Sequence, residues 1–263
     1  MDLGLEGKAA LVTASSKGLG KAAAVGLAKE GVNVVTCARG EEALRQTEAE
    51  IRALGRGEVE ALALDVSDPA SPAKLVAKTV ERFGRLDILV CNAGGPPPGP
   101  FMKFKDDDWQ MALNLNLMTT IRLCREAIPH MQRQGGGRIF TITSMGAKQP
   151  LDNLVLSNVS RAGVTALVKT LANELAGENI RVNNIMPGII YTDRIQFLIE
   201  NDAESRNVTV EEAKATREKD IPLGRMGRPE ELGNLIVFLA SEAGSYSTGA
   251  SIAVDGGRIK GLF

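Results

Sequence analysis

The side chains of this sequence that are best suited to chemistry lie between residues 144 and 163. Ser144 directly follows an apolar run at 138–143, which predicts a buried strand. Ser157 and Arg161 follow on a predicted helix, where a spacing of four residues places both side chains on one face. Because ligands of open α/β sheets bind beyond the carboxyl ends of the strands, we expect Ser144, Ser157 and Arg161 to converge on one cleft.

A glycine pattern near the start of the chain predicts a phosphate-binding loop. Gly18, Gly20 and Ala23 have the G-x-G-x-x-G/A spacing, and they join an apolar run at 9–13 to a helix of small residues. Glycine lets the backbone approach a pyrophosphate, and the amino terminus of the helix favours its negative charge. A purely structural turn is the alternative, but the strand–turn–helix context favours dinucleotide binding. The residues that we expect to contact the cofactor here are Thr13, Ser15, Ser16, Lys17, Gly18, Leu19 and Gly20.

The end of the second predicted strand, at 32–37, indicates which dinucleotide binds. NAD-binding chains carry a carboxylate about 20 residues beyond the glycines, where it holds the ribose 2′-hydroxyl. Here the strand is followed by Ala38, Arg39 and Gly40, without a carboxylate. Arg39 and Lys17 could instead pair with a 2′-phosphate, although each alone is often a surface charge. The sequence therefore favours NADP and leaves NAD as the alternative.

The elements that position these residues alternate along almost the whole chain. Apolar runs predict strands at 9–13, 32–37, 59–64, 87–91, 138–143, 181–186 and 251–254. Helical patterns are found at 20–29, 41–54, 69–83, 107–134, 154–175 and 229–241. Near-continuous apolar strands separated by helices imply a parallel sheet covered on both faces. We therefore predict an α/β fold: a single doubly wound Rossmann-type domain over residues 1–263, with a mostly parallel seven-stranded sheet.

One segment, at about 189–228, departs from this alternation. It carries a dense mixture of charges, and a solvated insertion is the simplest interpretation. Because it follows the carboxyl end of the strand predicted at 181–186, a mobile lid over the cleft is the alternative.

Composition and charge exclude several classes of function. Lys and Arg number 31 against 32 Asp and Glu, and a net charge of −1 argues against a nucleic-acid partner. The three cysteines are widely spaced, without a CxxC pair, so we expect neither disulfides nor a metal site. No basic and apolar leader begins the sequence, and no apolar run approaches the ~18 residues of a membrane span. These features predict a soluble, cytoplasmic protein without a membrane partner.

Ordered motifs along nearly the whole chain resemble those of the short-chain dehydrogenase/reductase family. The loop at 13–20 is similar to the family's Thr-Gly-x-x-x-Gly-x-Gly, with Ala14 in place of the first glycine. Residues 91–94 are similar to Asn-Asn-Ala-Gly, and Asn116 falls on the helix that carries the family's structural and catalytic asparagine. Residues 254–257, Val-Asp-Gly-Gly, match the carboxyl-terminal signature. The resemblance adds these expected cofactor contacts: Asp65, Val66, Asn92, Ala93, Gly94, Arg161, Pro187, Gly188, Ile190 and Thr192.

The last third of the chain most resembles 3-oxoacyl-[acyl-carrier-protein] reductases. That resemblance implies NADPH as the cofactor and a small-molecule carbonyl or hydroxy compound as the substrate. It also implies a homotetramer built on the two helices that follow the fourth and fifth strands.

The expected catalytic pair departs from the family pattern. In the family, a Tyr-x-x-x-Lys pair follows the serine, with the tyrosine thirteen residues after it as the proton donor. Here those places hold Ser157 and Arg161, and neither Tyr191 nor Tyr246 has a lysine four residues later. An aliphatic hydroxyl is a poor general acid, and arginine does not join a proton relay as lysine does. The sequence therefore supports cofactor binding more firmly than turnover.

Our leading hypothesis is an NADP(H)-dependent oxidoreductase that interconverts a carbonyl and a secondary alcohol, 3-oxoacyl reductase-like, with a divergent proton-donor site. Ser144 would bind the substrate oxygen, Asn116 would support the local water and backbone arrangement, and Arg161 would bind the nicotinamide ribose. Ser157 would be a weak donor or a water anchor, and Lys148, on the loop above, is a second candidate donor. The alternatives are a nucleotide-binding regulatory protein without redox turnover and non-redox, lyase-type chemistry on the same scaffold.

Overall fold

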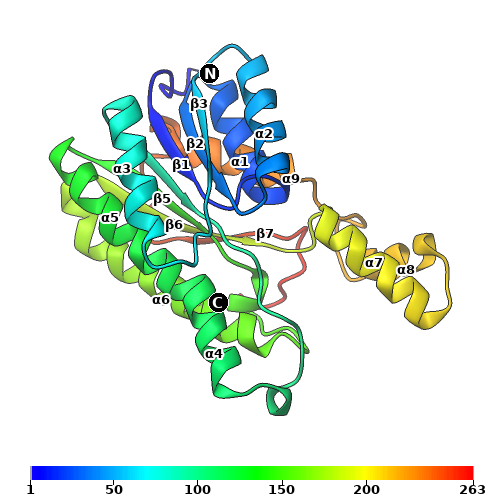
Figure 1. Ribbon diagram of the computed structural model, residues 1–263. Helices are drawn as coiled ribbons and strands as arrows, with labels where there is room; N and C mark the ends of the chain where they lie inside the picture. The colour runs from blue at the N-terminus through cyan, green and yellow to red at the C-terminus, as the bar shows by residue number, and fades with distance from the viewer. Residues whose placement is uncertain (1, 263) are drawn as a thin grey trace.

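Seven strands form one parallel sheet through the middle of the chain, as the computed structural model shows for residues 2–262 (Figure 1). The strand order is β3-β2-β1-β4-β5-β6-β7, and every neighbouring pair is parallel. The strands are β1 (Ala9–Val12), β2 (Asn33–Ala38), β3 (Val59–Ala63), β4 (Ile88–Cys91), β5 (Gly137–Ile142), β6 (Ile180–Pro187) and β7 (Ser251–Val254). The predicted single α/β domain is confirmed, and the described sheet is parallel throughout rather than mostly so.

Helices cover both faces of this sheet. One face packs against α1 (Gly18–Lys29), α2 (Glu41–Ala53) and α9 (Pro229–Ala240). The other packs against α3 (Ser71–Phe83), α5 (Thr119–Arg133) and α6 (Val155–Leu175). In the part of the chain that the structure describes, no helix has the length and apolarity to span a membrane.

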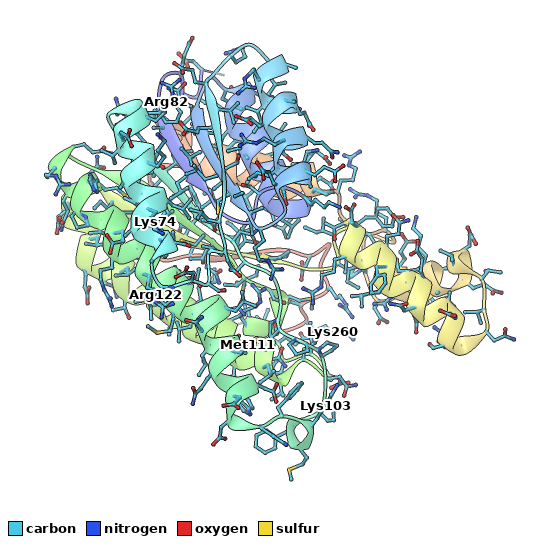
Figure 2. All side chains as sticks on the ribbon, viewed as in Figure 1. Lys74, Arg82, Lys103, Met111, Arg122 and Lys260 are labelled. Atoms are coloured by element: carbon cyan, nitrogen blue, oxygen red, sulfur yellow. The ribbon has the colours of Figure 1, made fainter. Side chains whose placement is uncertain are left out.

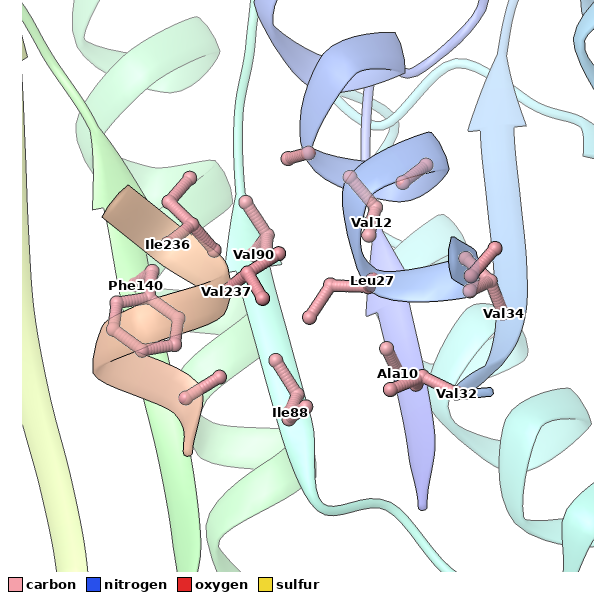
Figure 3. Close-up of a cluster of buried hydrophobic side chains, with 14 of the residues drawn as sticks. Ala10, Val12, Leu27, Val32, Val34, Ile88, Val90, Phe140, Ile236 and Val237 are labelled. Carbon is pink, nitrogen blue, oxygen red and sulfur yellow. The ribbon is translucent and has the colours of Figure 1, made fainter. Parts of the chain in front are cut away.

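The alternation of side chains along each strand divides the core into two layers. In β1, Ala10 and Val12 face the layer under α1 and α9, whereas Leu11 faces the layer under α3, α5 and α6. Figure 3 shows the first layer, where Leu27 of α1 and Val237 of α9 lie over the strands. Strands buried on both faces need the near-continuous apolar runs by which the sequence predicts them.

The chain reverses its direction of travel across the sheet at β1. From β1 it adds β2 and β3 on one side, and then crosses back so that β4 pairs with the other edge of β1. A crevice opens beyond the carboxyl ends of the strands at such a switch point. The loops that follow β1 and β4 flank this crevice, and those loops carry the predicted dinucleotide motif and residues 92–94.

The single helix predicted at 107–134 is wrong in one respect, because its middle is not α-helical. The structure has α4 (Asp106–Leu113), a π-helical turn η2 (Asn114–Met118) and then α5. The Thr119 hydroxyl donates to the carbonyl oxygen of Asn114, and the Asn114 amide donates to the carbonyl oxygen of Ser67. One extra residue in a turn leaves the apolar periodicity almost unchanged, so the pattern did not reveal it. Such π-turns often occur at functional sites.

The charged segment after β6 folds into two helices. They are α7 (Asp193–Arg206) and α8 (Val210–Glu218), which extend away from the sheet in Figure 1. A small apolar cluster of their own holds them together, formed by Ile199, Ala203, Ala213, Ile221 and Met226. The insertion is therefore ordered as a pair of helices with a small apolar cluster of its own.

Candidate active site

The loop after β1 is shaped by close backbone packing. Gly18 has a φ of +56°, and a Cβ atom on Gly20 would collide with the carbonyl oxygen of Ala14 and the Asn92 amide. Only glycine meets both demands without strain. The result is an open cradle at the amino terminus of α1, where backbone N–H groups and the helix dipole favour an anion.

Two buried hydroxyl groups brace this cradle from beneath. Thr13 Oγ1 donates to the carbonyl oxygen of Asn92 at 2.7 Å and accepts the Asn92 backbone N–H. Ser15 Oγ donates to the carbonyl oxygen of Val12 and accepts the backbone N–H of Cys37 at 3.0 Å. Both hydroxyl groups form their hydrogen bonds within the protein, so the Thr13 and Ser15 side chains stabilise the shape of the loop.

A cleft of about 440 Å³ runs from this loop along the ends of β2, β3 and β4. Its lining is Ala14, Ser16, Lys17, Cys37, Ala38, Arg39, Gly40, Leu64, Asp65, Val66, Gly94, Gly95 and Leu115. The long cleft with three loop glycines and few bulky side chains matches an extended ligand with a polar backbone.

Opposite charges meet at the outer end of the cleft. The Ser67 hydroxyl and backbone N–H both donate to Asp65 Oδ1, at 2.7 and 2.9 Å. These bonds, with the positive charge of Arg39, lower the pKa of Asp65. Arg39 and Lys17 line the same cleft, so an anionic group placed there would meet two cations.

Arg161 is buried at the inner end of the site, with 8% of its surface exposed. Its Nη1 donates to the carbonyl oxygens of Ile142 and Thr143, at 3.1 and 2.9 Å, and its Nη2 donates to that of Gly94 at 3.2 Å. Its Nε donates to Ser157 Oγ at 3.2 Å. Four of the five N–H groups of the guanidinium are therefore engaged. Burial lowers the pKa of Arg161 to about 10, so the group stays a cation near neutral pH.

Ser144 and Ser157 each accept a hydrogen bond that fixes the position of the oxygen. Ser144 Oγ accepts the backbone N–H of Gly146 at 3.1 Å, and Ser157 Oγ accepts the Nε–H of Arg161. Gly146 packs closely between Ser144 and Asn158, because a Cβ atom there would lie 3.4 Å from Ser144 Oγ and 2.6 Å from the Asn158 amide oxygen. Within the described chain, the hydroxyl protons of Ser144 and Ser157 are donated to no other group, which leaves both available to an acceptor.

Asn116 lies on the π-helical turn beside Arg161. It is buried, its backbone oxygen accepts the Thr120 hydroxyl at 2.8 Å, and it shares a small polar cavity with Arg161 and Thr143. The extra residue of the π-turn thus brings a polar side chain to the floor of the site.

The base of α7 closes one side of the cleft. Lys17 Nζ lies 3.4 Å from Asp193 Oδ2, which ties the loop after β1 to the first residue of α7. On the other side, the Arg194 guanidinium covers Gly95 so closely that a Cβ atom there would be 2.6 Å from its Nη1. The charge of Arg194 also contributes to the lowered pKa of Arg161, so two cations face each other across residues 94 and 95.

Comparison with known proteins identifies the family that shares this geometry. A family model described as enoyl-(acyl carrier protein) reductase matches residues 13–258. The chain is 36% identical over 255 residues to 3-oxoacyl-[acyl-carrier-protein] reductase FabG of Thermotoga maritima, covering 97% of this chain and 99% of the relative. A solved short-chain type dehydrogenase/reductase from Mycobacterium marinum superposes with a TM-score of 0.88 at 35% identity, over 98% of this chain and 97% of that one. This chain belongs to the short-chain dehydrogenase/reductase family.

A complex of another family member is closer still in shape. L-Sorbose reductase from Gluconobacter frateurii, complexed with NADPH and L-sorbose, superposes with a TM-score of 0.96 at 36% identity, and both chains are covered completely. The whole short-chain dehydrogenase/reductase fold, including α7 and α8, is therefore shared with an oxidoreductase.

The predicted site residues of this short-chain dehydrogenase/reductase fall into groups. Six predicted cofactor residues line the long cleft: Ser16, Lys17, Arg39, Asp65, Val66 and Gly94. Four predicted residues line the small cavity: Asn92, Ala93, Asn116 and Arg161. Lys148 is exposed at the end of the turn η3 (Met145–Ala147), and the remaining loop and β6-end residues flank the cleft without lining either cavity. Among the described residues, no cluster of three His, Cys, Asp or Glu is placed to hold a metal ion.

Sequence reasoning missed Arg194 and Gly95. Both lie directly beyond recognised motifs, because Gly95 follows Gly94 and Arg194 is two residues after Thr192. The sequence signal that could have identified them is their position, since Gly95 and Arg194 each extend a motif that was already expected to contact the cofactor. Their proximity depends on how α7 packs, which no local pattern encodes.

Ala14 is a strained position in the loop, and it predicts a stabilising substitution. Its φ is +47°, a left-handed conformation that costs an L-residue roughly 1–2 kcal/mol. We expect Ala14→Gly to raise the free energy of unfolding by about 1 kcal/mol, measured by urea denaturation. Ala53→Gly, at the end of α2, is the control and should be neutral or destabilising. An unstable Ala14→Gly variant would show that the methyl group packs favourably enough to outweigh the strain.

Proposed function

We propose that this protein is an NADP(H)-dependent oxidoreductase that interconverts a carbonyl and a secondary alcohol, with a 3-oxoacyl reductase-like scaffold and a divergent proton-donor site. Two observations carry the proposal together: the Ser144 and Ser157 hydroxyl groups are each fixed by a hydrogen bond, and a long cleft suited to a dinucleotide follows the strand ends. The similar FabG protein of Thermotoga maritima is a 3-oxoacyl-[acyl-carrier-protein] reductase, and the similar L-sorbose reductase was solved as a complex with NADPH and L-sorbose, a ketone sugar; both support the proposal.

The residues of the cleft fit NADP. A Cβ atom would fill the cradle at Gly20, and the glycines at 94 and 95 leave the wall beyond β4 open. The backbone around Gly18 would hold the pyrophosphate, and Asp65 and Val66 would hold the adenine. Arg39 and Lys17 would pair with the 2′-phosphate. When bound, the nicotinamide supplies or accepts the hydride.

The inner residues would act on the substrate oxygen. Ser144 and Ser157 would donate hydrogen bonds to it, and the bond that Ser157 accepts from the Arg161 cation makes its hydroxyl a stronger donor. Arg161 has one N–H group left, which could reach the nicotinamide ribose. In carbonyl reduction, one hydride and one proton are added to the C=O group, and water reaching the two serines would supply the proton.

Single-turnover absorbance tests this proposal directly. The protein would be titrated with NADPH and NADH and then mixed with ketones, 3-oxoacyl thioesters and an enoyl thioester. The enoyl thioester is included because the matching family model is that of enoyl-(acyl carrier protein) reductases. Oxidation of NADPH by a ketone supports the proposal. Tight NADPH binding without turnover across the panel would favour the nucleotide-binding regulatory alternative, and substrate loss without NADPH oxidation would favour the lyase alternative. Absence of binding at micromolar concentrations would reject the cofactor assignment.

Arg39 provides the sharpest test of cofactor preference. We expect Arg39→Ala to raise the Kd for NADPH by about tenfold, because it removes a charge-assisted contact to the 2′-phosphate. The Kd for NADH should change by less than about twofold, since NADH lacks that phosphate. Arg52→Ala, on the exposed face of α2, is the matched control. Equal losses for both nucleotides in Arg39→Ala would contradict the assignment.

We further propose that α7 and α8 act as a lid and that the protein is a homotetramer in the cytoplasm. The Lys17–Asp193 ion pair supports the lid, because it ties α7 to the cofactor loop. Partly exposed apolar side chains on the helices after β4 and β5, Met111 and Val159, support an interface there. Three free, buried cysteines are consistent with a reducing compartment. Light scattering tests the tetramer, which a monomer peak would reject.

A further inference from the structure

The segment after β7 brings a cation to the serine loop. Arg258 Nη1 lies 3.6 Å from Met145 Sδ, and Met145 is the residue after Ser144. The backbone N–H of Lys260 donates to Gln149 Oε1, which fastens the same segment to the other end of that loop. Figure 2 shows the labelled Lys260 on the side of the molecule that also carries Lys103 and Met111, on the segments that follow β4. The carboxyl-terminal segment thus forms a wall beside the proposed substrate oxygen site.

The Arg258 guanidinium is poorly partnered at this wall. Its side chain is 22% exposed, and in the described chain the one carboxylate within ion-pair distance is that of Asp220, whose Oδ2 is 3.8 Å from Nη2. Asp220 is 71% exposed, so water screens that pair strongly. A thioether is a weak acceptor, so Met145 satisfies little of the donor capacity. Several N–H groups therefore remain available to a ligand.

The acidic group on the same segment does not compete for Arg258. The Asp255 carboxylate accepts the backbone N–H groups of Gly257 and Ile259, at 2.9 and 2.7 Å. Across the cleft, the described chain gives Arg194 no carboxylate partner, and Arg161 is a buried cation. Arg161, Arg194 and Arg258 therefore place three positive charges on segments that adjoin Ser144 or residues 94 and 95.

From this arrangement we propose that the substrate carries a carboxylate, and that Arg258 binds it. The inference rests on the proposed carbonyl chemistry and names its substrate class, an oxo acid. A planar guanidinium holds a carboxylate by two parallel hydrogen bonds, which would orient the oxo group towards Ser144. The reaction would convert an oxo acid, one hydride from NADPH and one proton from water into a hydroxy acid and NADP⁺. The carboxylate is unchanged by the reaction and serves only to bind and orient the substrate.

Matched acids and esters test the proposal. The holoprotein with NADPH would be assayed with 2-, 3- and 4-oxopentanoate and with their methyl esters, which keep the oxo group but lack the charge. We expect at least one acid to have a KM about tenfold below that of its ester. Arg258→Met should raise the KM of that acid about tenfold and leave the ester and the NADPH Kd unchanged, whereas Arg258→Lys should restore part of the preference. Asp220→Asn should lower the KM of the acid, because it removes the competing carboxylate.

Two controls separate a binding role from other effects. Lys260→Met deletes the same charge two residues further along, where the side chain is exposed, and should leave the acid preference intact. Equal KM values for acid and ester would overturn the inference, and so would an equal loss of the acid preference in Lys260→Met and Arg258→Met. If no compound oxidises NADPH, the proposed function fails, and calorimetry with 4-oxopentanoate and the NADP⁺ complex then tests Arg258 alone. Equal affinity of wild type and Arg258→Met for that acid, or no binding by either, would again overturn it.

Discussion

Replacing Arg161 with methionine is expected to lower the free energy of unfolding by about 3 kcal/mol. The guanidinium joins three separate segments, because it donates to the carbonyl oxygens at the end of β5, to Gly94 after β4, and to Ser157 on α6. Methionine fills much of the same volume but leaves these buried acceptors without their donor, and each unmet polar group costs roughly 1–3 kcal/mol. Water entering the small neighbouring cavity recovers part of that cost. Urea denaturation measures the difference.

Two variants check that the lower free energy of unfolding comes from the hydrogen bonds of the buried Arg161 guanidinium. Arg161→Lys keeps the charge but cannot reach all four acceptors, so we expect an intermediate loss of stability. Arg206→Met removes an arginine that pairs with Asp202 on the surface of α7, and it should change the free energy of unfolding by less than about 0.5 kcal/mol. An Arg161→Met protein as stable as wild type would mean that the four hydrogen bonds contribute no net stability.

Most of the fold could be predicted from the sequence because its signals are local and repeated. Each strand is buried on both faces, so its apolar run is nearly continuous, and each helix between strands has its own pattern. The π-turn at 114–118 could not be predicted, since its evidence is a pair of tertiary hydrogen bonds, from Asn114 to Ser67 and from Thr119 to Val66. The two helices of the insertion were also hidden, because their apolar cluster is small and the surrounding residues are charged.

The candidate site divides in the same way between local and tertiary information. The glycine loop, Arg39 and the contact between Ser157 and Arg161 could be predicted from the sequence, because strand ends and helical spacing fix their positions. The direction of the Arg161 side chain could not be predicted from the sequence, since it depends on carbonyl oxygens from two other segments. Arg258 and Arg194 were also missed, because they reach the site from segments distant in sequence from Ser144.

Replacing Ser144 with alanine is expected to slow single-turnover oxidation of NADPH by about 100-fold or more, the usual effect of removing one donor from a reacting oxygen. The Kd for NADPH should stay within about twofold of wild type, because among the described residues Ser144 Oγ bonds to Gly146 of its own loop and to no cofactor-loop residue. Ser160→Ala is the matched control, since that hydroxyl donates to the helix carbonyl of Leu156 and is buried away from the cleft. A wild-type rate in Ser144→Ala, or equal slowing in Ser160→Ala, would remove Ser144 from the reaction.

The same assay decides whether Ser157 and Arg161 impair the reaction that the family's Tyr and Lys perform or support a different mechanism. Combining Ser157→Tyr with Arg161→Lys installs the family's proton donor and its partner. We expect this protein to be slower than wild type, because lysine cannot hold the carbonyl oxygens of Ile142, Thr143 and Gly94 together. Those oxygens position the strand end that carries Ser144, so the substrate oxygen would lose one donor while gaining another. A rate above wild type would instead show that the serine and arginine merely impair an inherited reaction, and it would reject the two-hydroxyl site as a distinct solution.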